Sequence, residues 1–263
     1  MMGADIKVLL LGLVTILLLA LYSFSDFDLE WKGSELRKAD FTSLYDIKAA
    51  DSLQSDYSID SLNPAYAVIR ETAATYNPDT TQNILFIGDS MLEGLTRRFI
   101  NYTDETGHEL NTIIWYSSTT ESWANTDTLN YFIKKFAPTY IVICLGSNEL
   151  FIKDLSKRKE NIAKIINRIG TIPFVWISPP NWKEDTGINE AILRAVGKDR
   201  YFDSRNLNLE RGHDHAHPTF RAAGEWMDTI ALWMSSDERM FPLRLNYPSQ
   251  ISTPRNITVL SPE

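Results

Sequence analysis

Three polar blocks along the sequence carry side chains that could act together in nucleophilic catalysis. The first, NILFIGDSMLEGL at residues 83–95, places Ser90 just after an apolar run, and the last, DHAHPT, places His217 three residues after Asp214. Serine is a poor nucleophile unless a base takes its proton and hydrogen-bond donors hold the oxyanion that forms. An imidazole oriented by a carboxylate would supply the base. Between these blocks, GSNEL offers the side-chain amide of Asn148 as an oxyanion donor.

Two further oxyanion donors are expected from the backbone. One is the N–H of Ser90, and the other is an N–H in the block YSSTTESW, where Ser118 is the nearest candidate. Other roles stay open at two of these positions, because serine is also a good helix cap and asparagine is also a good turn residue. For Ser90 the two roles are compatible, since a residue at the start of a helix can attack an ester from the same position.

The elements that must position these blocks alternate between short apolar runs and helical stretches. Both faces of the runs are apolar, as in the central strands of a parallel sheet that is covered by helices on each side. Ligands of such sheets bind at the loops beyond the carboxyl ends of the strands, where the three blocks fall. The pattern predicts strands at 83–88, 110–117, 140–146, 173–178 and 200–204, and helices from Met91 and over 126–136, 156–170, 188–196 and 218–234.

The blocks GDS at 88–90, GSN at 146–148 and DHAH at 214–217 resemble the signature blocks of the SGNH (GDSL) superfamily of esterases, lipases and acylhydrolases. The resemblance covers residues 83 to about 235, with the blocks in the family's order. It implies an α/β fold, a flavodoxin-like three-layer sandwich with a five-stranded, mostly parallel sheet. It also implies that Ser90 is the nucleophile, His217 the base, Asp214 the residue that orients it and Asn148 an oxyanion donor. No cofactor is expected.

The sequence departs from this family pattern at two positions. The family has a glycine after the second strand, where the nearest alignment places Ser118, and an aspartate after the asparagine, where this chain has Glu149. A side chain at the first position would crowd a site that glycine leaves open. A longer acid at the second would hold its loop differently. These departures keep open a third class of function, a binding module that retains the fold without catalysis.

Substrate contacts are expected from Trp123, Glu149 and Trp182, which fall in the loops at the active face. Flat aromatic rings there could stack on sugars, or they could simply close the pocket. The sequence has no long apolar lid beside the site, which favours an esterase acting on small acyl groups, such as O-acetyl groups of a glycan, over a lipase. An O-acyltransferase that uses the same residues, with a membrane-bound acyl-transfer partner, is the alternative.

Composition and histidine spacing bear on other classes of site. The formal net charge of −8 argues against a nucleic-acid partner. The single cysteine, Cys144, lies in an apolar run and is expected in the core. His213, His215 and His217 alternate in a way that could hold a metal ion, but no fourth ligand cluster is evident, so no metal site is predicted.

The amino-terminal residues 8–24 carry no charge and predict a signal anchor or a signal peptide, since their length is at the short end for a membrane span. Lys7 precedes them, which favours a cytoplasmic amino terminus and an extracytoplasmic chain, periplasmic or at the cell surface, that is anchored to the membrane. The predicted organisation is 1–25 anchor or signal, 26–80 polar stem or wrapping segment, 81–237 catalytic domain and 238–263 proline-rich tail lying on the surface.

Overall fold

The computed structural model describes residues 30–31, 34–35 and 71–261. The chain divides into two compact units, Met1–Asn63 and Pro64–Glu263, and the three polar blocks all lie in the second. In the first unit the structure describes two short antiparallel strands, β1 (Glu30–Trp31) and β2 (Ser34–Glu35). The predicted anchor at residues 8–24 lies outside the described residues. Within the described ranges, no helix combines the length and the apolar character needed to cross a membrane.

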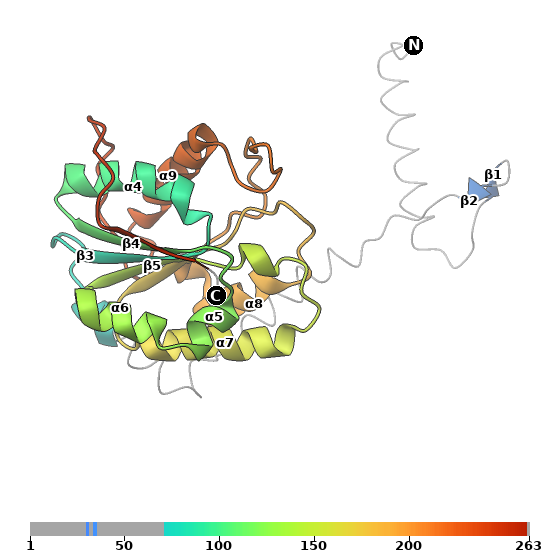
Figure 1. Cartoon of the computed structure of the whole chain (residues 1–263), viewed down its shortest axis with the longest axis horizontal. Coiled ribbons are helices and arrows are strands. Elements are labelled where there is room, and N and C mark those ends of the chain that lie inside the picture. The colour runs from blue at the N-terminus through green and yellow to red at the C-terminus, as the bar shows by residue number, and fades with distance from the viewer. Residues whose placement is uncertain (1–29, 32–33, 36–70, 262–263) are drawn as a thin grey trace, which may run out of the picture. The chain divides into compact units, whose positions relative to one another are not determined.

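The second unit is built on one parallel sheet (Figure 1), whose described strands follow the order β7-β6-β5-β3-β4-β8. The predicted α/β class with a parallel sheet is therefore confirmed. The predicted number of five strands is wrong, because the sheet has six. The strands are β3 (Asn83–Gly88), β4 (Glu109–Trp115), β5 (Tyr140–Cys144), β6 (Phe174–Ile177), β7 (Tyr201–Phe202) and β8 (Ile257–Leu260).

The sixth strand comes from the carboxyl-terminal tail, which was expected only to lie on the surface. Strand β8 pairs in parallel with β4, with Thr112 opposite Ile257 and Trp115 opposite Leu260. Its residues are exposed or only partly buried, as suits a strand at the edge of a sheet. The prolines that precede it indicate a loop, and four residues are too few to show a periodic pattern, so little in the sequence predicts this strand.

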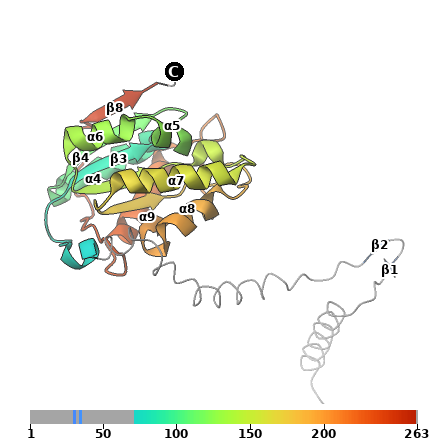
Figure 2. The same ribbon diagram turned by 90° about the horizontal axis from the view of Figure 1, so that it is seen from below.

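Helices cover both faces of the sheet: Figure 1 shows them as two layers, and Figure 2 looks onto the layer that contains α7. One layer contains α4 (Leu92–Thr106) and α9 (Phe220–Met234). The other contains α5 (Thr120–Asn125), α6 (Thr128–Phe136), α7 (Leu155–Ile169) and α8 (Ile188–Val196), and two short 3-10 helices, η2 (Ser147–Glu149) and η3 (Lys198–Arg200), complete the unit.

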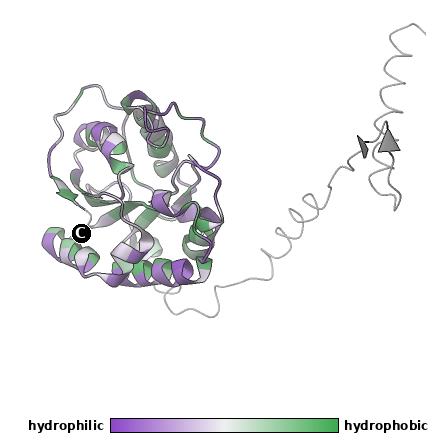
Figure 3. Cartoon of the chain, turned by 45° about the vertical axis from the view of Figure 1, so that its right-hand side comes forward, coloured by the Kyte–Doolittle hydropathy of each residue, from purple (hydrophilic) through white to green (hydrophobic). Residues whose placement is uncertain are grey.

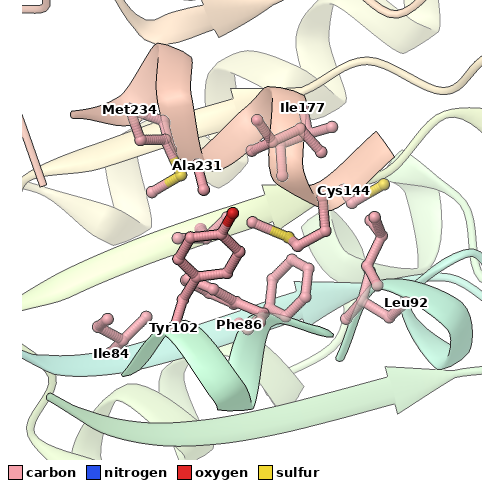
Figure 4. Packing of buried hydrophobic residues seen from close by; sticks show 14 of the residues in the cluster. Ile84, Phe86, Leu92, Tyr102, Cys144, Ile177, Ala231 and Met234 are labelled. Atoms are coloured by element: carbon pink, nitrogen blue, oxygen red, sulfur yellow. The ribbon is translucent and has the colours of Figure 1, made fainter. Parts of the chain in front are cut away.

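Alternate residues of β3 contribute to two separate hydrophobic clusters. Ile84 and Phe86 point toward α4 and α9, in the cluster drawn in Figure 4, and Leu85 and Ile87 point toward the opposite layer. All four are fully or almost fully buried. The helices in Figure 3 alternate between apolar and polar stripes, as helices that cover a sheet on one side must. Cys144 lies in the first cluster, as expected of a core residue.

The segment before β3 packs against this unit. Residues 71–75 are helical, and the Tyr76 hydroxyl donates to the carbonyl of Pro242 at 2.8 Å. The Tyr76 ring also meets the ring of Phe241 edge-on, at 5.6 Å between centroids. The described end of the predicted stem is therefore held by the tail that follows α9.

Helices α4 and α9 approach each other closely at a glycine. A Cβ atom on Gly94 would lie 2.5 Å from the Cβ atom of Ala223, which is far inside van der Waals contact. Gly224, the next residue of α9, has open space where its Cβ would be. The two glycines are both within helices, so they separate the effect of packing from that of helix propensity.

We expect opposite effects from alanine at these two positions. Gly94→Ala should lower the free energy of unfolding by about 1–3 kcal/mol, because the added methyl group overpacks the helix interface. Gly224→Ala should raise it by about 0.5–1 kcal/mol, because alanine is the better helix former. Urea denaturation of both variants would measure the difference. Stabilisation by both substitutions would contradict the close α4–α9 contact.

Candidate active site

Ser90 lies in the turn between β3 and α4. A Cβ atom on Gly88 would lie 1.9 Å from the carbonyl oxygen of Cys144 on β5, so only glycine fits where β3 ends. The side chain of Asp89 then accepts from the backbone N–H of Met91 at 3.0 Å. Met91 is the N-cap residue of α4 and makes no side-chain capping bond. The Ser90 hydroxyl is therefore not a helix cap, and it is free for another partner.

The loop before α9 is closed by backbone hydrogen bonds that hold His217 in place. Arg211 and Pro218 form an antiparallel bridge, and the N–H of Gly212 donates to the carbonyl of His217 at 2.8 Å. Asp214 accepts from the backbone N–H groups of Ala216 and His217, both at 3.0 Å. The chain therefore reverses within a few residues, which brings the His217 imidazole next to the carboxylate of Asp214 in the same loop.

The structure brings Ser90, His217 and Asp214 together in one hydrogen-bonded relay. Ser90 Oγ lies 2.7 Å from His217 Nε2, and His217 Nδ1 lies 2.6 Å from Asp214 Oδ2. The hydrogen bond from His217, together with the two backbone N–H groups, lowers the pKa of Asp214 below its usual range. An ionised carboxylate can only accept, so Nδ1 carries the proton and Nε2 is left to accept the hydrogen of the serine. This is the arrangement in which imidazole can act as a general base.

Asn148 lies in η2, in the loop after β5. Its side-chain amide donates to the carbonyl of Ser118 at 2.9 Å, which leaves the second amide hydrogen for another acceptor. Gly146 before it has φ +123°, a backbone conformation that side chains rarely adopt. Asn148 therefore joins the loop after β5 to the loop after β4.

The loop after β4 places its backbone donors differently from the prediction. The N–H of Ser118 donates to the carbonyl of Trp115 at 3.1 Å, so it is already engaged. That bond closes a turn in which Ser117, at φ +60°, takes the position that glycine prefers in a type II turn. Within residues 71–261 the N–H groups of Ser90 and Ser117 have no hydrogen-bond acceptor. By conformation, Ser117 rather than Ser118 is where a glycine would fit best.

Two residues expected to contact substrate are instead buried. Trp123 is 0% exposed, and its indole N–H donates to the Ser118 hydroxyl at 3.0 Å. Glu149 is also 0% exposed, and its carboxylate accepts from the N–H and the hydroxyl of Thr120, at 2.7 and 2.8 Å. Arg158 of α7 lies 3.1 Å from the same carboxylate. Neither side chain can reach a ligand, because each lies in the core beneath the loops and is engaged with a residue of the segment that follows β4.

Trp182, the third expected contact, is only partly buried. Its indole N–H lies 3.2 Å from both the carbonyl and the hydroxyl oxygen of Ser147, the residue before Asn148. The ring is therefore fixed to the loop that carries the candidate oxyanion donor.

Asp89 is a functional candidate that its sequence pattern alone does not identify. It is 0% exposed, and its second carboxylate oxygen accepts from the N–H of Ser147 at 3.2 Å. Burial raises its pKa to about 7, against the opposing effect of the two backbone N–H groups. The only signal in the sequence was its place in the GDS block. Through these two hydrogen bonds, Asp89 fixes the turn that carries Ser90 relative to the loop that carries Asn148.

The alternating histidines are the last candidate group. His213 and His215 are exposed, and His215 has φ +58°, while His217 is directed to Ser90. In the part of the chain that the structure describes, no three His, Cys, Asp or Glu side chains are grouped so that they could hold a metal ion.

Comparison with known proteins finds similar solved structures but no match of sequence. No protein-family model and no curated protein matches the sequence. Among solved structures, the chain is similar to a lipolytic protein of the G-D-S-L family from Desulfitobacterium hafniense DCB-2. The two are 16% identical with a TM-score of 0.41, and the match covers 56% of this chain and 98% of the other.

The neighbouring serines of the β4 loop should respond in opposite ways to substitution. Ser117→Gly should raise the free energy of unfolding by up to about 1 kcal/mol, because glycine adopts a positive φ without strain. Ser118→Ala should lower it by about 1–3 kcal/mol, because the buried indole N–H of Trp123 loses its acceptor. Thermal and urea denaturation would measure both. If Ser117→Gly is the more damaging change, the assignment of the turn is wrong.

Stability should also report the titration of Asp89. Its folded pKa of about 7 lies above its ordinary value of 3.8, so the folded protein retains a proton that the unfolded chain releases. The free energy of unfolding of the wild type should therefore fall relative to that of Asp89→Asn as pH rises from about 4 to 7. The slope can reach roughly 1.4 kcal/mol per pH unit. Parallel pH curves for the two proteins would contradict a raised pKa.

Proposed function

We propose that this protein is a serine esterase of the SGNH (GDSL) type that acts through an acyl-serine intermediate. The observation that carries the proposal is the relay Ser90–His217–Asp214, with hydrogen-bond distances of 2.7 and 2.6 Å. The relay joins two loops that are far apart in the sequence: Ser90 follows β3, and Asp214 and His217 lie together in the loop before α9. A role as a helix cap would not explain why the Ser90 hydroxyl is hydrogen-bonded to a histidine that is itself bonded to a carboxylate.

In the first half of the reaction, Ser90 Oγ attacks the ester carbonyl carbon while its proton passes to His217 Nε2. The tetrahedral intermediate collapses as His217 returns that proton to the leaving alcohol, and the acyl group stays on Ser90. In the second half, His217 takes a proton from water, the resulting hydroxide attacks the acyl carbon, and the proton goes back to Ser90. Asp214 remains ionised throughout and stabilises the imidazolium that forms.

The oxyanion of each tetrahedral intermediate needs hydrogen-bond donors that are already in place. The candidates are the N–H of Ser90, the second amide hydrogen of Asn148 and the N–H of Ser117. The positive end of the α4 helix dipole adds its field at the same point. Asp89 and the bond from Asn148 to Ser118 keep these three loops from moving apart.

The exposure of the site supports a solvated substrate. The side chains of His217 and Asp214 are 42% and 53% exposed, so the relay lies at the surface of the described unit. Such a site suits a small acyl group on a large, water-soluble carrier, and we propose an O-acetyl ester of an extracytoplasmic glycan. The uncharged segment at residues 8–24 supports a membrane-anchored position outside the cytoplasm.

The solvent exposure of the relay also allows an alternative reaction, the transfer of the acyl group to an acceptor other than water. A site that admits water to the acyl-serine can also admit a sugar hydroxyl, which would make the protein an O-acetyltransferase. The first half of the reaction and its residues are unchanged. Only the acceptor of the acyl group differs.

Hydrolysis of an aryl acetate by the full-length protein should depend on the relay. Ser90→Ala and His217→Ala should each lower kcat/KM by at least about a thousandfold, because the nucleophile or its base is lost. His213→Ala, a change to an exposed histidine of the same loop, should leave it unchanged. Release of the aryl alcohol at wild-type rates by both relay variants would end the proposal. With an acetylated glycan, acetate found on an added oligosaccharide rather than in solution would identify the transferase.

A further inference from the structure

Two aromatic side chains and a lysine form a patch on the loops after η2 and β6. Phe151 is 52% exposed, and its ring meets that of Trp182 edge-on, with the centroids 6.3 Å apart and an interplanar angle of 83°. The ammonium group of Lys183 lies 4.7 Å from the centroid of the Trp182 ring and 5.2 Å from that of Phe151. We refer to Phe151, Trp182 and Lys183 as the aromatic platform.

The platform is fixed to both sides of the site. Trp182 donates to Ser147, whose own N–H donates to Asp89, the neighbour of Ser90. On the other side, the Arg211 guanidinium donates to the carbonyl of Ala216, the residue before His217, at 2.7 Å. Its second amino group lies 3.5 Å from the carbonyl of Asn181, the residue before Trp182. A ligand bound on the platform is therefore held at the edge where an ester would meet Ser90.

The charge on the platform is uncompensated. Within residues 71–261 no carboxylate lies within ion-pair distance of Lys183, and its ammonium group is stabilised only by the faces of the two rings. Several basic side chains of the same unit do have carboxylate partners, as Lys157, Arg221 and Arg244 do. An exposed cation above apolar rings is suited to a ligand that carries both an apolar face and an anion.

We propose that the aromatic platform binds a sugar residue bearing a carboxylate, so that the substrate is an O-acylated acidic glycan. The apolar face of the pyranose ring would pack on Phe151 and Trp182, and its carboxylate would pair with Lys183. An acyl chain is the poorer occupant, because it would remove the ammonium group from water without giving it a partner. The inference rests on the esterase proposal and adds the class of its substrate.

Turnover of matched substrates tests the proposal with the full-length protein. The substrates are an O-acetylated uronic-acid oligosaccharide, its carboxyl-reduced and re-acetylated counterpart, and an aryl acetate too small to reach the platform. Wild type should prefer the acidic oligosaccharide, and Lys183→Gln should lower kcat/KM for it alone by about three- to fivefold. Phe151→Ala should lower it for both oligosaccharides by about three- to tenfold. Neither change should affect the aryl acetate.

Tyr131→Ala is the matched control, because Tyr131 is 55% exposed and has a lysine near its ring but lies on α6, away from the relay residues. This substitution should leave kcat/KM unchanged for all three substrates. Equal turnover of the acidic and the reduced oligosaccharide, with no effect of Lys183→Gln, would overturn the proposal while leaving the esterase intact.

Binding separates this proposal from the proposed reaction. Calorimetry with the Ser90→Ala protein and an unacetylated uronic-acid oligosaccharide should show binding that Phe151→Ala and Lys183→Gln each weaken. Loss of binding in these variants would support the platform even if aryl acetate hydrolysis did not depend on Ser90. Unchanged binding would exclude the platform even if that hydrolysis did depend on Ser90.

Discussion

The close approach of β3 and β5 at Gly88 is the constraint on which the rest of the site depends. The carbonyl of Cys144 lies where a Cβ atom would be, and it accepts from the N–H of Asp89 at 3.2 Å. The chain after β3 is thereby pressed against the chain after β5, and Asp89 is buried between them. Its carboxylate can then hold the Ser90 turn with one oxygen and the Asn148 loop with the other. The raised pKa of Asp89 is a consequence of this burial.

His217 is positioned next to Ser90 by a different contact, the packing of α9 on α4. Thr219 caps α9 two residues after His217, so the position of that helix sets the position of the imidazole. Gly94 and Ala223 allow the two helices to touch, and the carboxylate of Asp228 accepts from Arg98 and Tyr102 of α4. Ser90, at the amino end of α4, and His217, before the amino end of α9, are therefore held by one helix pair.

The two tryptophans in the active-face loops show how one residue type can serve two purposes. Trp123 fills the core under the loop after β4 and holds Ser118 through its N–H, whereas Trp182 uses its N–H to hold Ser147 and leaves part of its ring at the surface. Glu149 resembles Trp123 in this respect, since its carboxylate serves the backbone of Thr120 rather than a ligand. The rigidity of the loops thus depends on buried polar groups, each with its partner.

By itself, the sequence determined the parallel α/β class, the approximate strands and the blocks that contain Ser90, Asn148, Asp214 and His217, because these depend on local patterns and on the edge where parallel strands end. It did not determine strand β8, the burial of Trp123 and Glu149, the role of Asp89 or the shift from Ser118 to Ser117. Each of these depends on which groups far apart in the chain come within hydrogen-bond or van der Waals contact. The spacing of residues says which groups can share an edge. Only packing in three dimensions decides which of these groups are exposed to a ligand and which are buried and hydrogen-bonded to neighbouring loops.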